Sequence, residues 1–408
     1  MRILLTATAS YAPPRGGATR SNLVWLSRLA SAGHACRIVC GAAGEGAPFP
    51  HHQSIVLMGI EDPARRVQVL RRQIEEFQPD WVLASSEDLG HALLREAHHS
   101  AEGRVVYLAH TPQFFPFGPA SWNPERHAAE LVARSAGVVA IGRHMAGYVE
   151  RELGREAAVI HPPIYGPGPF PNLANFDRGL IAMINPCAVK GISIFLAAAE
   201  RLPGLRFGAT PGWGTTFEDR RALARLPNVE ILPNPAGIDE LLQGARILLM
   251  PSLWHEGFGL IVMEAMLRGI PVVASDLGGL REAKQGTGYL IPVARIESYE
   301  PVFDEHGMPR PAAPDNDAAP WVAAIEELLS DRGAYERESA ASREAAHRFV
   351  AALDDSGMER FLVSLGASGA KAALGAGSAR PDAATVESLS PGKRALLLQR
   401  LRRRGVIH

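Results

Sequence analysis

The sequence has few cysteines, no long apolar run and almost no net charge. Its 408 residues carry a formal net charge of −1 and only three cysteines, Cys36, Cys40 and Cys187. An odd, small number of cysteines in apolar contexts favours reduced core thiols and excludes a disulfide or metal framework. The balanced charge offers no basic surface for nucleic acid. No apolar run approaches the roughly 18 residues of a membrane-spanning helix, so we expect a cytoplasmic protein.

The glycine fingerprint of dinucleotide-binding enzymes, GxGxxG, is also absent after the first predicted strand. The chain reads Tyr11-Ala12-Pro13-Pro14-Arg15-Gly16-Gly17 there. Gly16 and Gly17 can nevertheless bring backbone amides close to an anion at the start of the following helix. A tight turn without a ligand is the alternative.

Apolar runs of strand length alternate with helical patterns, which is typical of parallel βαβ units. The predicted strands are residues 2–7, 37–40, 81–85, 105–109, 138–141, 180–184, 205–208, 229–232, 247–250 and 270–274. The stiff, turn-rich segment 162–171 interrupts this alternation, and we place a domain boundary there. We expect an α/β protein with domains at 1–168 and 169–334, each long enough to bury its own core.

The segment from Pro251 to Met266, PSLWHEGFGLIVMEAM, carries most of the functional information. Gly257 and Gly259 allow close backbone approach, and with Phe258 their amides open a helix, where anions such as phosphate bind. Glu264 lies inside an almost wholly apolar helix, where an ionised carboxylate needs a partner. An i,i+4 pair with Arg268 is one explanation. Two ribose hydroxyls of a nucleotide are the other.

This segment, followed by GIPVVAS at 269–275 and GGLRE at 278–282, resembles the Glu-x7-Glu motif of retaining glycosyltransferases of family 4. The resemblance implies a GT-B fold: two facing Rossmann-like domains with parallel sheets, and a C-terminal helix, here 335–365, that crosses back to the first domain. It also implies that Glu256 contacts the donor sugar and Glu264 the ribose. No catalytic metal is expected, and Asp315-Asn316-Asp317 is interpreted as a surface loop in the Pro-rich insertion 294–320.

The resemblance assigns further roles in donor binding. Gly16 and Gly17 match a glycine pair beside the donor phosphate. His110, which follows the strand 105–109, matches a histidine that faces the donor sugar, although a structural histidine is the alternative. Lys190, before Gly191, matches a cation of the diphosphate clamp, with a solvated lysine as the alternative. Asn185 stands where the family usually has Arg, and an amide brings no charge.

The expected function is metal-independent transfer of a sugar from a nucleotide sugar to an unknown acceptor, with Glu256, His110 and Lys190 as the catalytic candidates. A GT-B epimerase and a catalytically silent partner protein are the alternatives. Residues 366–408 should be a flexible linker followed by a short basic amphipathic tail. The tail, LSPGKRALLLQRL at 389–401, resembles linker helices of nonribosomal peptide synthetases. It favours a secondary metabolite as acceptor and docking to a biosynthetic assembly line.

Overall fold

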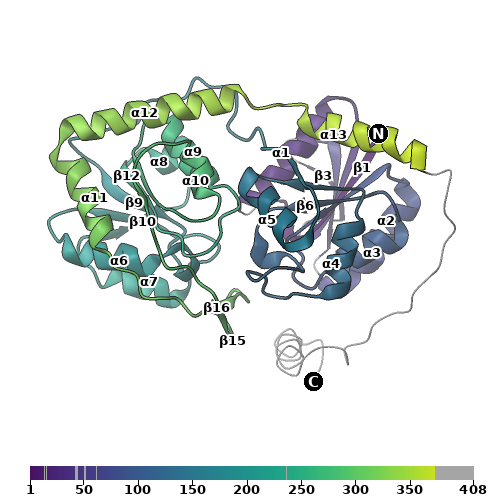
Figure 1. Ribbon diagram of the computed structural model, residues 1–408, viewed down its shortest axis with the longest axis horizontal. Helices are drawn as coiled ribbons and strands as arrows, with labels where there is room; N and C mark the ends of the chain where they lie inside the picture. The colour runs from purple at the N-terminus through teal and green to yellow at the C-terminus, as the bar shows by residue number, and fades with distance from the viewer. Residues whose placement is uncertain are drawn as a thin grey trace.

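Two Rossmann-like α/β domains, each built on a parallel sheet, form the molecule (Figure 1). The computed structural model describes residues 1–12, 14, 16–41, 45–49, 52–60, 62–235 and 237–372. The basic tail with the sequence at 389–401, and with it the predicted docking to an assembly line, lies outside these residues. Over the part of the chain that is described, no helix is both long and apolar enough to cross a bilayer.

The first domain has an eight-stranded sheet with the order β3-β4-β2-β1-β5-β6-β7-β8. All neighbouring strands pair in parallel except β3 and β4. Its strands are β1 Arg2–Ser10, β2 Ala35–Gly41, β3 Glu45–Phe49, β4 His52–Ile60, β5 Trp81–Ser85, β6 Val105–Ala109, β7 Gly137–Ala140 and β8 Ala158–Val159. Its helices are α1 Gly17–Ser31, α2 Arg66–Phe77, α3 Ala92–Ser100, α4 Arg126–Arg134 and α5 Arg143–Leu153, with 3-10 turns at Pro63–Arg65 and Pro112–Phe114.

The second domain has a six-stranded parallel sheet with the order β11-β10-β9-β12-β13-β14. Its strands are β9 Leu180–Ile184, β10 Phe207–Thr210, β11 Val229–Ile231, β12 Ala245–Met250, β13 Val272–Ser275 and β14 Leu290–Ile291. Its helices are α6 Ile192–Arg201, α7 Phe217–Ala224, α8 Ile238–Leu242, α9 Leu260–Leu267, α10 Leu280–Ala283 and α11 Ala319–Ser330, and η3 Ala188–Lys190 is a 3-10 turn.

Central strands of both sheets are apolar along their whole length because helices cover both faces. Every residue of β5, β6 and β7 is buried, and β12 and β13 are almost as apolar. These continuous apolar runs are the signal that predicted ten of the strands. The strands of segment 45–60 were not predicted, although residues 55–58 form a short apolar run, and β4 pairs in parallel with β2 and extends the first sheet.

The chain returns to the first domain through two helices, not the single helix expected at 335–365. Helix α12 (Arg332–Ala351) stays on the second domain, and α13 (Gly357–Ala372) lies against the first (Figure 1). The helix breaks between them because Asp354 forms a local turn, accepting the backbone N–H of Ser356 at 3.0 Å. Met358 and Leu362 of α13 are buried in the core of the first domain, which fixes the helix there.

The Pro-rich insertion 294–320 folds into an antiparallel hairpin, β15 (Tyr299–Phe303) and β16 (Pro309–Pro311). Figure 1 shows the hairpin projecting beside the space between the two domains, on the side away from α12 and α13. A two-stranded hairpin is marginally stable alone, so its position depends on the side chains that anchor it.

Candidate active site

The candidate residues gather where the carboxyl ends of the two sheets face each other, the usual ligand-binding edge of open α/β sheets. Three contacts join the domains there. A Cβ atom on Gly257 would lie 2.1 Å from the carbonyl oxygen of His110, and one on Gly17 would lie 3.2 Å from Leu260 Cδ1. A Cβ on Gly16 would lie 3.9 Å from the indole of Trp213. The structure therefore brings the glycine turn of one domain against the glycine-rich turn of the other.

Glu256 and Lys190 form a buried ion pair at the centre of this region. Lys190, in η3 after β9, donates to Glu256 Oε1 at 2.5 Å. Ser252 Oγ and the indole N–H of Trp254 donate to the same oxygen at 2.6 and 2.8 Å. Both side chains are about nine-tenths buried, at 12% and 10% exposure. The close fit behind Lys190 requires Gly191, because a Cβ there would lie 1.9 Å from the carbonyl oxygen of Pro251.

The turn 257–259 presents the N-terminus of α9 without a capping side chain. Gly259 takes a φ of 109°, which favours glycine, and no side chain hydrogen bonds to the first amides of the helix. Its positive end therefore suits an anion. Phe258 contributes only its backbone to this turn, since its ring is 2% exposed and stacks on Phe349 of α12 with 5.3 Å between centroids.

Glu264 forms an ion pair with Arg268. This pair is one of the two explanations that the sequence left open for a carboxylate inside an apolar helix. Arg268 Nη1 donates to Glu264 Oε2 at 2.8 Å, and both side chains are buried. Burial raises the pKa of the Glu264 carboxyl, and the guanidinium groups of Arg268 and Arg20 oppose that shift. Arg20 belongs to α1 of the first domain, so Glu264 also faces across the cleft. The pair occupies Oε2 and does not exclude a hydroxyl on the other oxygen.

Asn185 holds a loop of the second domain. Its Oδ1 accepts the backbone N–H of Gly214 at 2.9 Å and the Thr215 hydroxyl at 3.4 Å. Its φ of 57° is in the left-handed region, where asparagine is tolerated better than most residues. The side-chain amide nitrogen is buried and has no protein partner. This side-chain nitrogen is the part of Asn185 that remains available for the predicted contact with the nucleotide-sugar donor.

His110 lies inside the first domain instead of facing an open cleft. It is 2% exposed, stacks on Trp25 with 5.8 Å between ring centroids, and its Nε2 lies 2.7 Å from Asn22 Oδ1. Since that oxygen only accepts, the histidine donates from Nε2, and burial lowers its pKa to about 3. Nδ1 is buried without a partner. A neutral His110 can accept a hydrogen bond there, and its backbone carbonyl reaches Gly257.

Glu282 joins the domains through contacts that the sequence did not reveal. It lies at the N-terminus of α5, where the backbone N–H of His144 donates to it at 3.2 Å, and His161 Nε2 lies 2.8 Å away. Burial opposes ionisation, but these hydrogen bonds and the nearby Arg143 amide outweigh it and lower the pKa of Glu282. Glu282 is the last residue of the GGLRE segment at 278–282. Its partners lie more than a hundred positions away in the sequence, so that segment alone did not predict them.

Two histidines form a further contact between the domains. His144 of α5 stacks on His255, with 5.3 Å between ring centroids and 3.2 Å between Nε2 and Nδ1. Burial lowers the pKa of each to about 4, and the nearby positive charge of Arg151 contributes to the lowering in both. His255 directly precedes Glu256, so the contact reaches the candidate site. The two histidines belong to no recognisable motif, so the sequence did not predict their contact.

The Asp-x-Asp sequence at 315–317 lies near the end of the insertion 294–320 and helps to join its two ends. Asn316 exchanges hydrogen bonds with the backbone of Ala294 at 2.8 and 3.1 Å, which ties the two ends of the insertion together. Asp317 accepts the backbone N–H of Ala319 at the start of α11 and pairs with Arg201 at 3.3 Å. Within the described ranges, no three His, Cys, Asp or Glu side chains are arranged to hold a metal ion.

Comparison with known proteins gives two family matches. Residues 15–165 match the model described as Glycosyltransferase Family 4, and residues 179–331 match Glycosyl transferases group 1. A D-inositol 3-phosphate glycosyltransferase of Mycobacteroides abscessus is 34% identical over 177 residues, which cover 38% of this chain and 40% of that protein. The chain thus spans about two fifths of the length of this curated relative.

Two solved structures extend the similarity over most of the chain. Sucrose-phosphate synthase from Thermosynechococcus elongatus has a TM-score of 0.66 and 17% identity, covering 91% of this chain and 98% of its own. Anabaena HepE in complex with UDP-glucose has a TM-score of 0.66 and 15% identity, covering 90% and 100%. At these identities the likeness establishes the fold: both domains and their arrangement follow the GT-B architecture.

Proposed function

The chain belongs to glycosyltransferase family 4, and from this premise we propose that it transfers a sugar from a nucleotide sugar to an acceptor hydroxyl, retaining the anomeric configuration and using no metal ion. The observation that carries the proposal is the Lys190–Glu256 pair beside the uncapped N-terminus of α9. It places the cation of Lys190, from η3, beside a carboxylate and oriented amides that lie together at residues 256–259.

Each part of a nucleotide sugar, the diphosphate, the ribose and the transferred sugar, would have a matching group in this arrangement. The diphosphate would lie at the amides of residues 257–259, with Lys190 and the Gly16–Gly17 turn beside it. The ribose would contact Glu264, through the oxygen that Arg268 does not occupy. Glu256 would then orient a hydroxyl of the donor sugar. Nucleotide sugars are the ligand class that needs all of these groups in this order.

In the proposed reaction the bond between the anomeric carbon and the β-phosphate oxygen breaks, and its electron pair stays on the phosphate. The acceptor oxygen attacks the same face of the sugar, and its proton passes to the departing phosphate oxygen. Lys190 and the amides at the start of α9 stabilise the charge that develops there, which is the role elsewhere filled by a metal ion.

The hydrogen bonding of Glu256 favours this path over a double displacement. A carboxylate nucleophile has to move onto the anomeric carbon and form a covalent bond. Three donors hold Glu256 Oε1 in place, from Lys190, Ser252 and Trp254. A carboxylate fixed in this way is suited to orienting a sugar hydroxyl. Retention without a protein nucleophile is accordingly the mechanism proposed.

The proposed acceptor is a secondary metabolite, which rests on the resemblance of the tail at 389–401 to linker helices of nonribosomal peptide synthetases. Two other functions use the same cleft. An epimerase would change the donor without an acceptor, and a silent partner protein would bind the donor without changing it. Because the HepE structure contains UDP-glucose, UDP-sugars are the first donors to test.

Incubation of the full chain with a panel of nucleotide sugars separates these functions. Transfer releases the nucleoside diphosphate and makes a new glycoside by mass spectrometry, an epimerase isomerises the donor, and a silent protein does neither. Anomeric coupling constants of the product test retention. Activity should persist in EDTA, and loss of turnover that Mg²⁺ or Mn²⁺ restores would refute metal independence.

The variant Glu256→Gln provides the residue-level test. It keeps the size of the side chain but removes the charge that pairs with Lys190. We expect kcat to fall about 100-fold or more, as for loss of one oriented transition-state group, with nucleotide affinity nearly unchanged. Equal kcat in the variant and the parent would remove Glu256 from the mechanism.

A further inference from the structure

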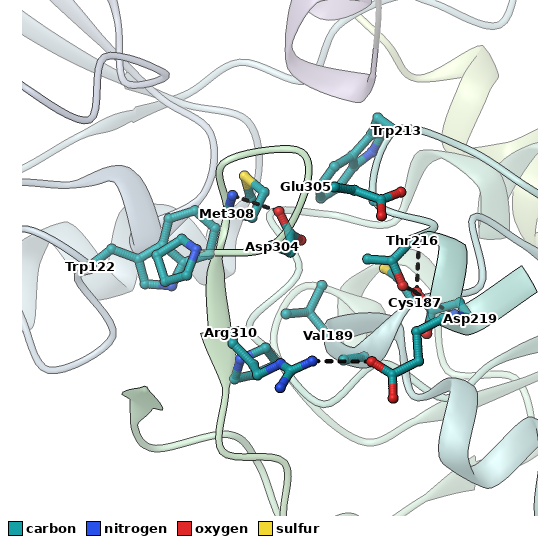
Figure 2. A pocket seen from close by; sticks show the side chains of 15 residues that line it. Trp122, Cys187, Val189, Trp213, Thr216, Asp219, Asp304, Glu305, Met308 and Arg310 are labelled. Atoms are coloured by element: carbon teal, nitrogen blue, oxygen red, sulfur yellow. Dashed lines mark hydrogen bonds and ion pairs between the residues drawn. The ribbon is translucent and has the colours of Figure 1, made fainter. Parts of the chain in front are cut away.

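A pocket lies between the hairpin β15–β16 and the start of α7, beside the candidate active site. It has a volume of about 200 Å³. Figure 2 shows the hairpin on one side, α7 and η3 on the other, and Trp122 reaching in from the first domain. The side chains that decide its chemistry are Trp122, Trp213, Glu218, Asp219, Asp304, Glu305 and Arg310.

The hairpin is fixed over this pocket by specific bonds. Glu305 accepts the backbone N–H of Phe217 at 2.9 Å, and Arg310 pairs with Glu218 at 3.1 Å. On the opposite side, the ring of Tyr299 packs edge-on against Trp122 of the first domain, with 5.4 Å between centroids. The hairpin therefore contacts both domains and forms a wall of the pocket.

The pocket is strongly acidic. Four carboxylates and one guanidinium, that of Arg310, line it. Burial raises the pKa of Asp219, and the neighbouring Glu218 and Asp304 raise it further by repulsion. A cation bound here would relieve this repulsion, whereas a phosphate-bearing ligand would increase it.

Tryptophan rings connect the pocket to the candidate catalytic pair. The rings of Trp122 and Trp213 both pack against Trp254, at 6.2 and 5.9 Å between centroids, and Trp254 donates to Glu256. Trp213 is 38% exposed and also borders Gly16. Exposed indole faces bind the apolar faces of sugar rings and attract cations. A ring held in the pocket would thus lie next to the sugar held by Glu256.

We propose that this pocket is the acceptor subsite, and that it binds a hydroxyl-rich ring carrying a protonated amine, an amino sugar or an aminocyclitol. The tryptophan faces hold the ring, and the carboxylates hold its ammonium and hydroxyl groups. This inference rests on the proposed glycosyl transfer, which supplies the donor. It also predicts a different acceptor charge from the inositol phosphate in the name of the mycobacterial relative.

The first test is direct binding, which does not depend on turnover. Glucosamine, N-acetylglucosamine and glucose 6-phosphate are titrated into the full chain while tryptophan fluorescence is followed. We expect glucosamine to bind at least tenfold more tightly than its neutral N-acetyl form, with no response to the phosphate ester. The preference should weaken at high salt. Equal affinity for the amine and the neutral form would overturn the proposal.

Variants locate the binding. The double change Glu218→Gln with Glu305→Gln removes two charges and keeps their size. It should raise the Kd of glucosamine about tenfold and leave the Kd of UDP unchanged. Glu300→Gln, on an exposed position of β15 outside the pocket, is the matched control and should change neither value. A double variant that behaves like the control would place the amine elsewhere.

Transfer assays distinguish failure of this inference from failure of the proposed function. If the chain glycosylates neutral acceptors and amines equally well, and the double variant does too, the proposed function holds and the acidic subsite is wrong. If no donor supports transfer but glucosamine binds with the predicted charge dependence, the pocket is an amine-binding site, and both the proposed function and the acceptor role of the pocket are wrong.

Discussion

Replacement of Gly257 by alanine tests the interdomain geometry on which the candidate site depends. The added Cβ would lie 2.1 Å from the carbonyl oxygen of His110, whereas contacts under 3.0 Å are essentially never seen. One of the two segments must therefore move by about 0.9 Å. His110 cannot move easily, because it follows the fully buried strand β6 and its N–H donates to Ser86 Oγ at 3.1 Å.

The displacement should therefore fall on the turn that contains Glu256 and the start of α9. Misplacement of reacting groups by about 1 Å can cost about 100-fold in rate, so we expect kcat/KM for transfer to fall by about that factor. Overpacking should also lower the free energy of unfolding by about 1–3 kcal/mol. Steady-state kinetics and urea denaturation measure the two effects.

A matched control is Gly204→Ala, where no atom lies within 4 Å of the added Cβ and φ is not in the left-handed region. It should retain the activity and stability of the parent. If Gly257→Ala also retains both, the two domains do not meet at this contact, and the catalytic geometry inferred from it is wrong.

Three further predictions concern binding and stability. Glu264→Ala should weaken nucleotide binding by about 1–3 kcal/mol in calorimetry and, because it removes a partner of Arg268, also lower the unfolding free energy by a similar amount. His144 and His255 have lowered pKa values, so their contribution to stability is complete above pH 6.5 and lost as the pH falls toward 4. The loss, on the order of 3 kcal/mol, should be smaller in the double Asn variant. Deletion of 373–408 should leave donor affinity intact, because every proposed donor contact precedes residue 290; a folded but non-binding truncation would contradict this.

Local patterns in the sequence were sufficient for an α/β protein of two domains, and the resemblance to family 4 glycosyltransferases added the GT-B arrangement and the cleft. Strands such as β6 and β12 are continuous apolar runs because both faces of a parallel sheet are covered. Lys190 and Glu256 each follow a strand of the second sheet, whose carboxyl ends share one edge, whereas the position of His110 across a cleft between two domains was implied by the resemblance to GT-B enzymes. The helix break at Asp354 depends on one local turn within an otherwise helical pattern, and the pattern alone did not locate it.

What the sequence did not reveal depends on contacts between distant segments. Glu282 meets His161, and Trp122 meets Tyr299, only because the two domains pack together. The hairpin β15–β16 lacks the tight-turn glycine pair of short hairpins and is held by its contacts with α7. The spacing of apolar residues along the chain carries no information about contacts between segments so far apart.

The cation that balances the donor diphosphate is the remaining question, and the structure of Asn185 narrows it. Asn185 accepts hydrogen bonds that hold the loop of Trp213 and takes a left-handed backbone conformation, which suits asparagine, and it brings no charge where the family resemblance leads us to expect a guanidinium. Arg20 is exposed on α1, and its charge acts on Glu264 across the cleft. We predict that Arg20 supplies the missing charge.

Arg20→Ala should weaken UDP binding about fivefold to tenfold at low salt, equivalent to about 1.4 kcal/mol at the upper value. The difference should shrink as salt rises, because the contact is exposed to solvent. Arg28→Ala is the control: Arg28 lies on the same helix but pairs with Asp355 at 3.1 Å. Calorimetry that finds the same UDP affinity in both variants would rule out Arg20 as a cation that contacts the diphosphate.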